Sequence, residues 1–397
     1  MRKISALLIF LISFSAMALD YGIDRLSESE IAQKFNGKNL AVLTHSAAKT
    51  KTGIHLIDFL HQKFQLKKIF APEHGLRTLA DDWVEDGTDE STGLPVISLY
   101  KRGAKAPRAE DLQGIDAIVI DLQDVGVRYY TYFSTIVEVM KATATLNVEV
   151  ILLDRPNLLG GEIVEGKVLD EELAGNFISY HTVPTRHGMT LGELALMINE
   201  EKKIGSRLTI IPVFGWKREN ILVLNERPWI SPSPALTEIT QVRYYNLWGT
   251  MENFNLSVGR GKTNELAFKV IGSPWITPKE SIELARQLNE LKIDGAVFTP
   301  FNWKVTRAIY EGSQAFGVQL KLSDKEIRSD ELTYKVSSVL SKMFPERLTM
   351  SALAPNFYGS KQIVNAIKSN IPWEDLQSSI DLEIENFKQR RAPYLLY

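Results

Sequence analysis

The chain has 397 residues, of which 44% are apolar and 24% are charged, and its formal net charge is -2 at pH 7. This length exceeds one ordinary hydrophobic core, so we expect about two domains, and the balanced charge excludes both a nucleic-acid-binding footprint and a disordered acidic tail. The absence of cysteine excludes disulfides, thiolate zinc sites, a cysteine nucleophile and a lipid-modified N-terminal cysteine.

The first 18 residues differ in character from the rest of the chain. Met1-Arg2-Lys3 is a basic start, residues 4–16 are apolar but too short to span a bilayer comfortably, and residues 16–18 have the small-x-small form of a cleavage site. We predict a signal peptide over residues 1–18, with an uncleaved anchor as the alternative. No later stretch approaches membrane-spanning length, so we expect a periplasmic or secreted mature chain without a membrane span.

Short apolar runs alternate with helical spacing through the first half of the chain. The runs predict strands at 39–44, 68–71, 96–99, 115–121, 148–153 and 208–213, and the spacing predicts helices at 53–64, at 130–144 and from about residue 191. Strands that alternate with helices favour a Rossmann-like parallel sheet with helices on both faces. We assign this domain to residues 19–250.

The second half has a mixed pattern. It predicts helices near 279–291, 332–343, 361–368 and 373–390, and strands near 296–301 and 317–322. This mixture predicts a smaller α+β domain, which we assign to residues 251–397.

Polar residues follow the last apolar residue of several predicted strands: His45, Glu73, Asp121, Asp124, Asp154 and Arg155. Ligands of open α/β sheets bind outside the carboxyl ends of the strands, so we expect these side chains along one edge of the sheet. Pro72 ends the strand before Glu73, and Gly75 permits a tight turn. The alternative for Pro-Glu-His-Gly is an ordinary polar turn.

The phosphate-binding fingerprints are absent. No Gly-x-Gly-x-x-Gly follows the first strand, and Gly261-Lys262-Thr263 lacks the first glycine of a P-loop, since position 256 is leucine. No Gly-x-Ser-x-Gly elbow occurs either. We therefore expect neither a nucleotide cofactor nor an α/β-hydrolase triad.

A metal shell of nitrogen and oxygen ligands can be drawn from four residues of this edge. These residues are His74, His187, Asp121 and Asp124. They lack the close spacing of His-Glu-x-x-His and related motifs. We expect no metal and no cofactor, with a site built from sequence-distant ligands as the alternative.

Six motifs occur in order along the chain, at residues 72–75, 121–132, 154–166, 186–195, 232–235 and 391–397. Together they resemble the NamZ family of exo-β-N-acetylmuramidases, also catalogued as DUF1343, from about residue 20 to the C-terminus. The resemblance implies a Rossmann-like domain with a smaller C-terminal domain and a glutamate in the cleft between them. It also implies release of N-acetylmuramic acid from the non-reducing ends of peptidoglycan fragments.

The resemblance points to Glu73 as the catalytic glutamate, because it belongs to the best-matched motif. Glycoside hydrolysis needs an acid and commonly a second carboxylate, and the acid must keep its proton near neutral pH. We predict Glu73 as the general acid. For the second carboxylate we choose Glu165 over Glu162, with Asp121 and Asp124 as rivals.

The remaining residues of these motifs suit saccharide binding, namely His74, Asp121, Asp124, Arg128, Tyr130, Arg155, Asn157, His187 and Arg260. Arg128, Arg155 and Arg260 are candidates for the lactyl carboxylate of muramic acid, since a guanidinium binds a carboxylate through two parallel hydrogen bonds. The alternatives are core packing for the tyrosines and a local salt bridge between Asp154 and Arg155.

One segment departs from the family pattern. Residues 252–267 read Glu-Asn-Phe-Asn-Leu-Ser-Val-Gly-Arg-Gly-Lys-Thr-Asn-Glu-Leu-Ala. The family has Gly-Thr in place of Asn253-Phe254, a threonine in place of Lys262 and a Pro-Phe-Glu in place of residues 265–267. An altered segment keeps open a non-catalytic peptidoglycan-binding protein. A metal-dependent hydrolase is the third hypothesis, and the oligomeric state is left open.

Overall fold

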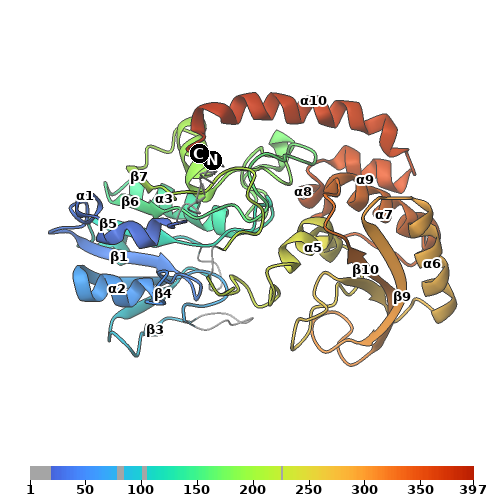
Figure 1. Cartoon of the computed structure of the whole chain (residues 1–397), viewed down its shortest axis with the longest axis horizontal. Coiled ribbons are helices and arrows are strands. Elements are labelled where there is room, and N and C mark those ends of the chain that lie inside the picture. Colours follow the sequence, from blue (N-terminus) through green and yellow to red (C-terminus); the bar gives the residue numbers. More distant parts are fainter. Residues whose placement is uncertain (1–18, 78–84, 101–104, 225–226) are drawn as a thin grey trace, which may run out of the picture.

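The computed structural model describes residues 19–77, 85–100, 105–224 and 227–397. Two sheets organise these residues (Figure 1). The larger sheet has seven strands in the order β3-β4-β2-β1-β5-β6-β7, and all neighbours are parallel except β3 and β4. Its strands are β1 (Asn39–Thr44), β2 (Gln65–Ala71), β3 (Gly87–Thr88), β4 (Pro95–Ser98), β5 (Ala117–Asp121), β6 (Glu149–Leu153) and β7 (Leu208–Ile211).

Helices cover both faces of the large sheet, which confirms the predicted fold class. Successive strand residues face opposite sides: Ile118 and Ile120 of β5 pack with α3 (Tyr132–Ala144) and α4 (Leu191–Glu201), whereas Val119 packs with α2 (Leu56–Lys63) on the other side. The helix α2 begins three residues later than predicted, because His55 caps it by accepting a hydrogen bond from the Ile57 amide at 3.3 Å.

The order of the strands reverses at β1. The chain runs from β1 outward to β2 and β4, and then starts again at β5 on the other side of β1 and continues to β6 and β7. Ligands of such sheets bind in the crevice outside the carboxyl ends of the strands at this reversal point. The loops after β1, β2 and β5 are therefore the ones to inspect.

The second part of the chain contains a three-stranded antiparallel sheet in the order β8-β10-β9. The strands are β8 (Val270–Ser273), β9 (Ala296–Lys304) and β10 (Gln314–Leu322), and the sequence predicted the last two but not the four-residue β8. Most helices of this part were predicted; the helices here are α5 (Gln241–Trp248), α6 (Pro278–Glu290), α7 (Ser329–Met343), α8 (Ala354–Tyr358), α9 (Lys361–Lys368) and α10 (Trp373–Arg391).

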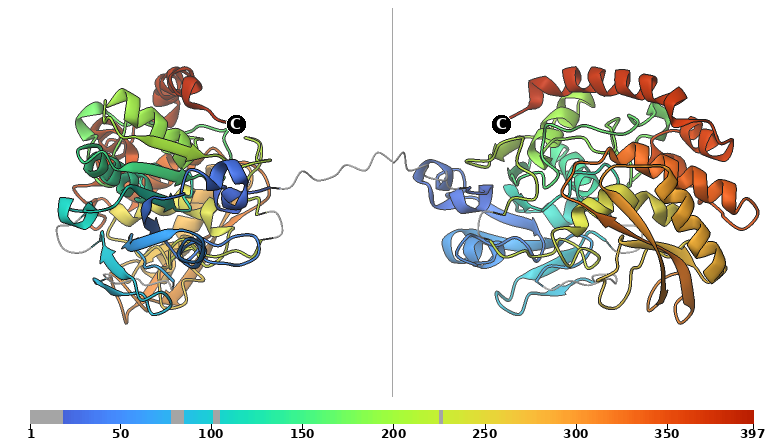
Figure 2. Two further views of the ribbon diagram at one scale, coloured as in Figure 1. Left: turned by 90° about the vertical axis from the view of Figure 1, so that its left-hand side faces the viewer. Right: turned by 45° about the vertical axis from the view of Figure 1, so that its right-hand side comes forward.

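The chain returns to the first part through α10, which runs along the top of both parts in Figures 1 and 2. At its end, Arg391 donates to the backbone oxygens of His187 at 3.0 Å and Gly161 at 2.9 Å. The hydroxyl of the last residue, Tyr397, donates to Asp154 at 2.7 Å. These contacts tie the C-terminal residues to the carboxyl edge of the large sheet.

The predicted signal peptide, residues 1–18, lies outside the described residues. Among the residues that are described, no helix combines the length and the apolar character needed to cross a membrane.

Candidate active site

Glu73 lies on the turn that follows β2, at the carboxyl edge of the large sheet. The next two residues both have left-handed backbone angles, with φ of 74° at His74 and 91° at Gly75. Glycine adopts this conformation without strain, but a histidine does so only when its surroundings hold it there, and such residues cluster at functional sites. The tight turn expected at Gly75 is therefore present, and it fixes the direction of Glu73.

The carboxylate of Glu73 is held by two hydroxyl groups. Thr131, which precedes α3, donates to Glu73 Oε2 at 2.8 Å, and the hydroxyl of Tyr100 also hydrogen-bonds to Glu73. The His74 ring nitrogen Nε2 lies 4.0 Å from the other carboxylate oxygen. The Glu73 side chain remains 23% exposed, so it is positioned by the protein and still accessible to a ligand.

A second carboxyl group faces this site from the other part of the chain. Glu252 lies in a short 3₁₀ helix, Gly249–Asn253, and accepts a hydrogen bond from Arg260 at 3.1 Å. Burial raises the pKa of Glu252, and the charge of Glu73 adds to the rise, against the opposing effect of Arg260. The two carboxyl groups are thus within electrostatic range. The side chains of Glu252 and Arg260 keep 27% and 35% exposure.

Asp124 and Tyr130 adjoin Glu73 as buried groups with unused polar atoms. Asp124 Oδ2 accepts from the Gly126 amide at 2.7 Å, while Asp124 Oδ1 and the Tyr130 hydroxyl have no partner among the described residues. Burial raises the pKa of Tyr130, and the charges of Asp124 and Glu73 contribute to the rise. Buried polar atoms are normally paired, so a buried water molecule is a suitable partner for them.

His187 and Asn157 lie behind Asp124 and support it. His187 Nε2 is 3.8 Å from Asp124 Oδ2, and its Nδ1 accepts from the Met189 amide at 3.1 Å. Burial lowers the pKa of His187 to about 3, so the ring is neutral. Asn157 donates to the Met189 carbonyl at 2.9 Å. Both residues, expected to bind substrate, have buried side chains that hold the loops in place.

Burial also raises the pKa of Asp124 to about 7, well above the ordinary value of 3.8. When folding raises the pKa of an acid, the folded state is favoured at pH values below the pKa of the unfolded chain, about 3.8 here. This contribution to stability is lost as the pH rises through the folded pKa of about 7. We therefore expect the stability of Asp124→Asn relative to wild type to rise between about pH 5 and about pH 8, by roughly 3 kcal/mol. Urea unfolding at both pH values measures this, with exposed Asp324→Asn as the control; equal differences at both pH values contradict it.

Two predicted arginines use their donors within the protein. Arg128 is buried and donates to the carbonyls of Val183 at 2.7 Å and Phe357 at 2.8 Å. Arg155 forms a buried ion pair with Asp121, at 3.1 Å between Nη2 and Oδ2, instead of a local pair with Asp154. Of the three arginines considered for the lactyl carboxylate, Arg260 is the one that is partly exposed, and it pairs with Glu252.

Glu165 lies where the first part of the chain meets α7. Its carboxylate accepts from the Ser329 hydroxyl at 2.6 Å and lies 3.6 Å from Arg186. Burial raises the pKa of Glu165. No contact among the described residues joins it to Glu73, so the structure does not bring the two predicted catalytic glutamates together.

The sequence reasoning did not select several residues around Glu73, namely Tyr100, Thr131, Tyr132, Tyr245 and Glu252. Thr131 and Tyr132 stand within the motif that supplied Tyr130, and Glu252 opens the segment that supplied Arg260. Membership of these motifs was therefore the signal that could have identified Thr131, Tyr132 and Glu252 from the sequence. Among the described residues, no group of three or more His, Asp or Glu side chains is arranged to hold a metal ion.

Comparisons with known proteins cover almost the whole chain. The family models described as exo-beta-N-acetylmuramidase NamZ, N-terminal and C-terminal, match residues 40–240 and 243–397. A curated relative, peptidoglycan beta-N-acetylmuramidase NamZ of Bacillus subtilis (strain 168), is 32% identical over 383 residues, which is 95% of this chain and 91% of the relative.

Two solved structures of DUF1343 family proteins from Bacteroides fragilis NCTC 9343 are also similar. Their TM-scores are 0.85 and 0.76, at 30% and 25% sequence identity, and each comparison covers 96% of this chain and 99% of the other. Together with the carboxyl groups gathered from both parts, these matches define the class of protein, a two-domain α/β glycosidase. The chain belongs to the NamZ family of exo-β-N-acetylmuramidases.

Proposed function

We propose that the protein is an exo-acting glycosidase that releases N-acetylmuramic acid from the non-reducing ends of peptidoglycan fragments. The observation that carries this proposal is that Glu73 and Glu252, two partly exposed acids from the two parts of the chain, lie close enough for the charge of Glu73 to raise the pKa of Glu252, in a protein of this family. Glycoside hydrolysis commonly uses two carboxyl groups that flank the scissile bond.

In this proposal, Glu73 donates a proton to the leaving glycosidic oxygen. Thr131 and Tyr100 hold its carboxyl group in one orientation, which is what a proton donor within hydrogen-bond reach requires. Glu252 replaces Glu165 as the second carboxyl group, because it shares the site with Glu73. Asp124, with its unpaired oxygen, is the remaining rival for that role.

Arg260 is the residue we assign to the lactyl carboxylate of the muramic acid. It is partly exposed, it pairs with Glu252, and a guanidinium suits the recognition of a carboxylate. Arg260→Ala should therefore reduce the preference for muramic acid over glucosamine glycosides.

The altered segment leaves the acidic site in place. Lys262 and Glu265, two of the departures from the family pattern, are exposed. Asn253 and Phe254 are buried, whereas Glu252 and Arg260, which the family pattern shares, are present and form an ion pair. This placement favours a catalyst over a binding protein that has lost turnover.

We also propose that the protein acts in the periplasm or outside the cell, where peptidoglycan lies. The basic start, the apolar stretch and the small residues at 16–18 support this location. N-terminal sequencing of the exported protein should begin at Leu19.

The experiment that tests the activity is incubation of the purified mature chain with para-nitrophenyl β-glycosides of N-acetylmuramic acid and N-acetylglucosamine. We expect release of nitrophenol from the first and far less from the second. Tight binding of muropeptides without any release of sugar contradicts the proposal and favours the non-catalytic alternative. Loss of activity on chelation favours a metal-dependent hydrolase.

A further inference from the structure

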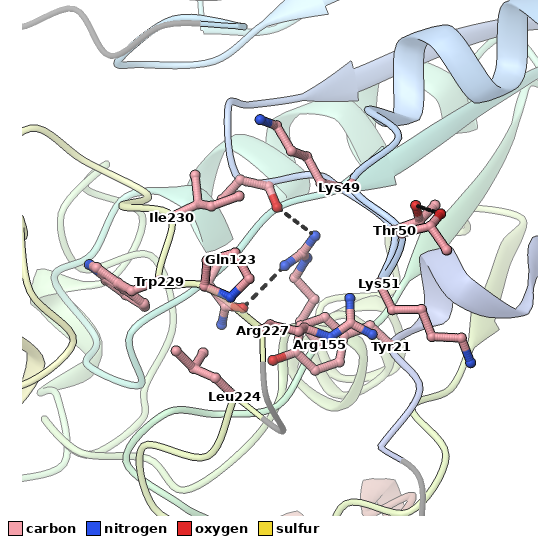
Figure 3. A pocket seen from close by; sticks show the side chains of 14 residues that line it. Tyr21, Lys49, Thr50, Lys51, Gln123, Arg155, Leu224, Arg227, Trp229 and Ile230 are labelled. Atoms are coloured by element: carbon pink, nitrogen blue, oxygen red, sulfur yellow. Dashed lines mark hydrogen bonds between the residues drawn. The ribbon is translucent and has the colours of Figure 1, made fainter.

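A pocket of about 370 Å³ lies at the reversal point of the large sheet (Figure 3). Ala47 of the loop after β1, Gln123 of the loop after β5 and Arg155 of the loop after β6 line it. Tyr21 near the N-terminal end and Trp229 of the loop before α5 complete the wall. This volume falls in the range of small-molecule sites, and the position is the one where open α/β sheets bind ligands.

The lining of the pocket is cationic. Its described residues include Lys49, Lys51, Arg155 and Arg227, and no aspartate or glutamate. Three of these cations have acidic partners that do not line the pocket, with Lys51 paired to Asp20, Arg155 to Asp121 and Arg227 to Asp24.

Lys49 is the exception, because its ammonium group has no hydrogen bond or ion pair among the described residues. Figure 3 shows Lys49 and Arg155 on the same pocket. An uncompensated positive charge in a concave site attracts an anion.

Aromatic rings form another part of the wall. Tyr21 packs under two guanidinium groups, with Arg227 4.1 Å and Arg155 5.2 Å from the ring centre. Its hydroxyl is buried and has no partner among the described residues. Trp229 is fixed by a hydrogen bond from its indole nitrogen to the Leu236 carbonyl at 3.0 Å. Rigid rings beside polar donors suit a ligand with both apolar faces and hydroxyl groups, as a sugar has.

A wall of protein separates this pocket from Glu73. On one side, Tyr132 directs its hydroxyl toward the Glu73 carbonyl at 3.4 Å and the Pro232 carbonyl at 2.7 Å. The ring of His45 stacks on Tyr132 with centres 5.4 Å apart. Ala47 and Ile230, which neighbour His45 and Pro232 in the chain, face the pocket on the other side. Glu73 and the groups bonded to it do not line the pocket.

We infer that this pocket is a second ligand site, which binds a monosaccharide that carries a carboxylate or a phosphate group. Lys49 binds the anionic group, as the charge of the lining that is compensated only when the ligand is present, while Lys51, Arg155 and Arg227 keep their acidic partners. Trp229 contacts the sugar ring. Binding here does not depend on hydrolysis at Glu73.

The test is isothermal titration calorimetry with three probes, namely glucuronate, glucose 6-phosphate and uncharged glucose. We expect the charged probes to bind and glucose to bind at least about tenfold more weakly, and we expect binding to weaken as salt is added. Comparison of the first two probes distinguishes a carboxylate ligand from a phosphate ligand. The Glu73→Gln protein should bind them as wild type does, because Glu73 lies outside the pocket.

Lys49→Gln assigns the binding to this pocket. Removal of one charge-assisted hydrogen bond should lower the affinity for the charged probes by about tenfold. Lys67→Gln, at an exposed position on β2, is the matched control and should leave the affinity unchanged. Thermal melting of both variants verifies that they are folded. Equal binding of glucose, no binding of the charged probes, or an unchanged affinity in Lys49→Gln overturns the inference.

Discussion

Glu73→Gln is expected to lower hydrolysis of a muramyl disaccharide by about 10²–10⁴-fold, the usual contribution of a positioned general acid. The amide can still accept the hydrogen bond from Thr131, so the turn and its left-handed backbone should be preserved. What is lost is the proton for a leaving sugar hydroxyl, which is a poor leaving group without protonation. Release of free N-acetylmuramic acid measures the effect, with exposed Glu30→Gln as the control for a surface change of the same kind.

The leaving group separates the role of Glu73 from that of Glu252. A nitrophenolate departs with little help from an acid, so Glu73→Gln should retain much more activity on the para-nitrophenyl glycoside than on the disaccharide. Glu252→Gln should reduce hydrolysis of both substrates to a similar degree, because a second carboxyl group acts at the sugar carbon or on water. If Glu73→Gln reduces the hydrolysis of both substrates equally, the general acid is another group.

The turn at Glu73 was predictable because its causes are local. An apolar strand, a proline that ends it and a glycine that takes a positive φ all stand within a few residues of each other. The alternation of strands and helices likewise gave the parallel sheet. Strand β8 reads Val-Ile-Gly-Ser, in which glycine and serine follow only two apolar residues, so it was not predicted.

The contacts between these local features depend on which strands become neighbours, and no single segment of the sequence determines that. Arg155 follows Asp154 in the chain, but Asp154 accepts hydrogen bonds from Thr190 at 2.6 Å and from the Gly192 amide at 2.9 Å. Arg155 instead meets Asp121, because β5 and β6 lie side by side and end at the same edge. Glu252 comes within electrostatic range of Glu73 only because the second part of the chain folds against the first.

Loss of the Asp121–Arg155 pair should have the largest effect on stability. The side chains of Arg155 and Asp121 are 6% and 0% exposed, and Arg155 also donates to the Ala47 carbonyl at 3.0 Å. Arg155→Ala leaves the Asp121 carboxylate buried without its cation, which typically costs about 3–5 kcal/mol. Urea unfolding should show this loss. Arg286→Ala, which removes exposed ion pairs with Glu283 and Glu290, should lower stability far less.

The double replacement Asp121→Leu with Arg155→Met tests whether the stability lost in Arg155→Ala comes from the buried, unpaired charge of Asp121. Taking both charges out of water is costly, so an apolar pair of similar volume should recover most of the stability that Arg155→Ala loses. A double variant as unstable as Arg155→Ala would instead mean that the contacts of Arg155 with Ala47 and Gln123 hold this edge together. The pair joins the ends of β5 and β6, so its loss should loosen the loops that carry Asp124 and Thr131. Hydrolysis should therefore fall together with stability in Arg155→Ala and recover in the double variant.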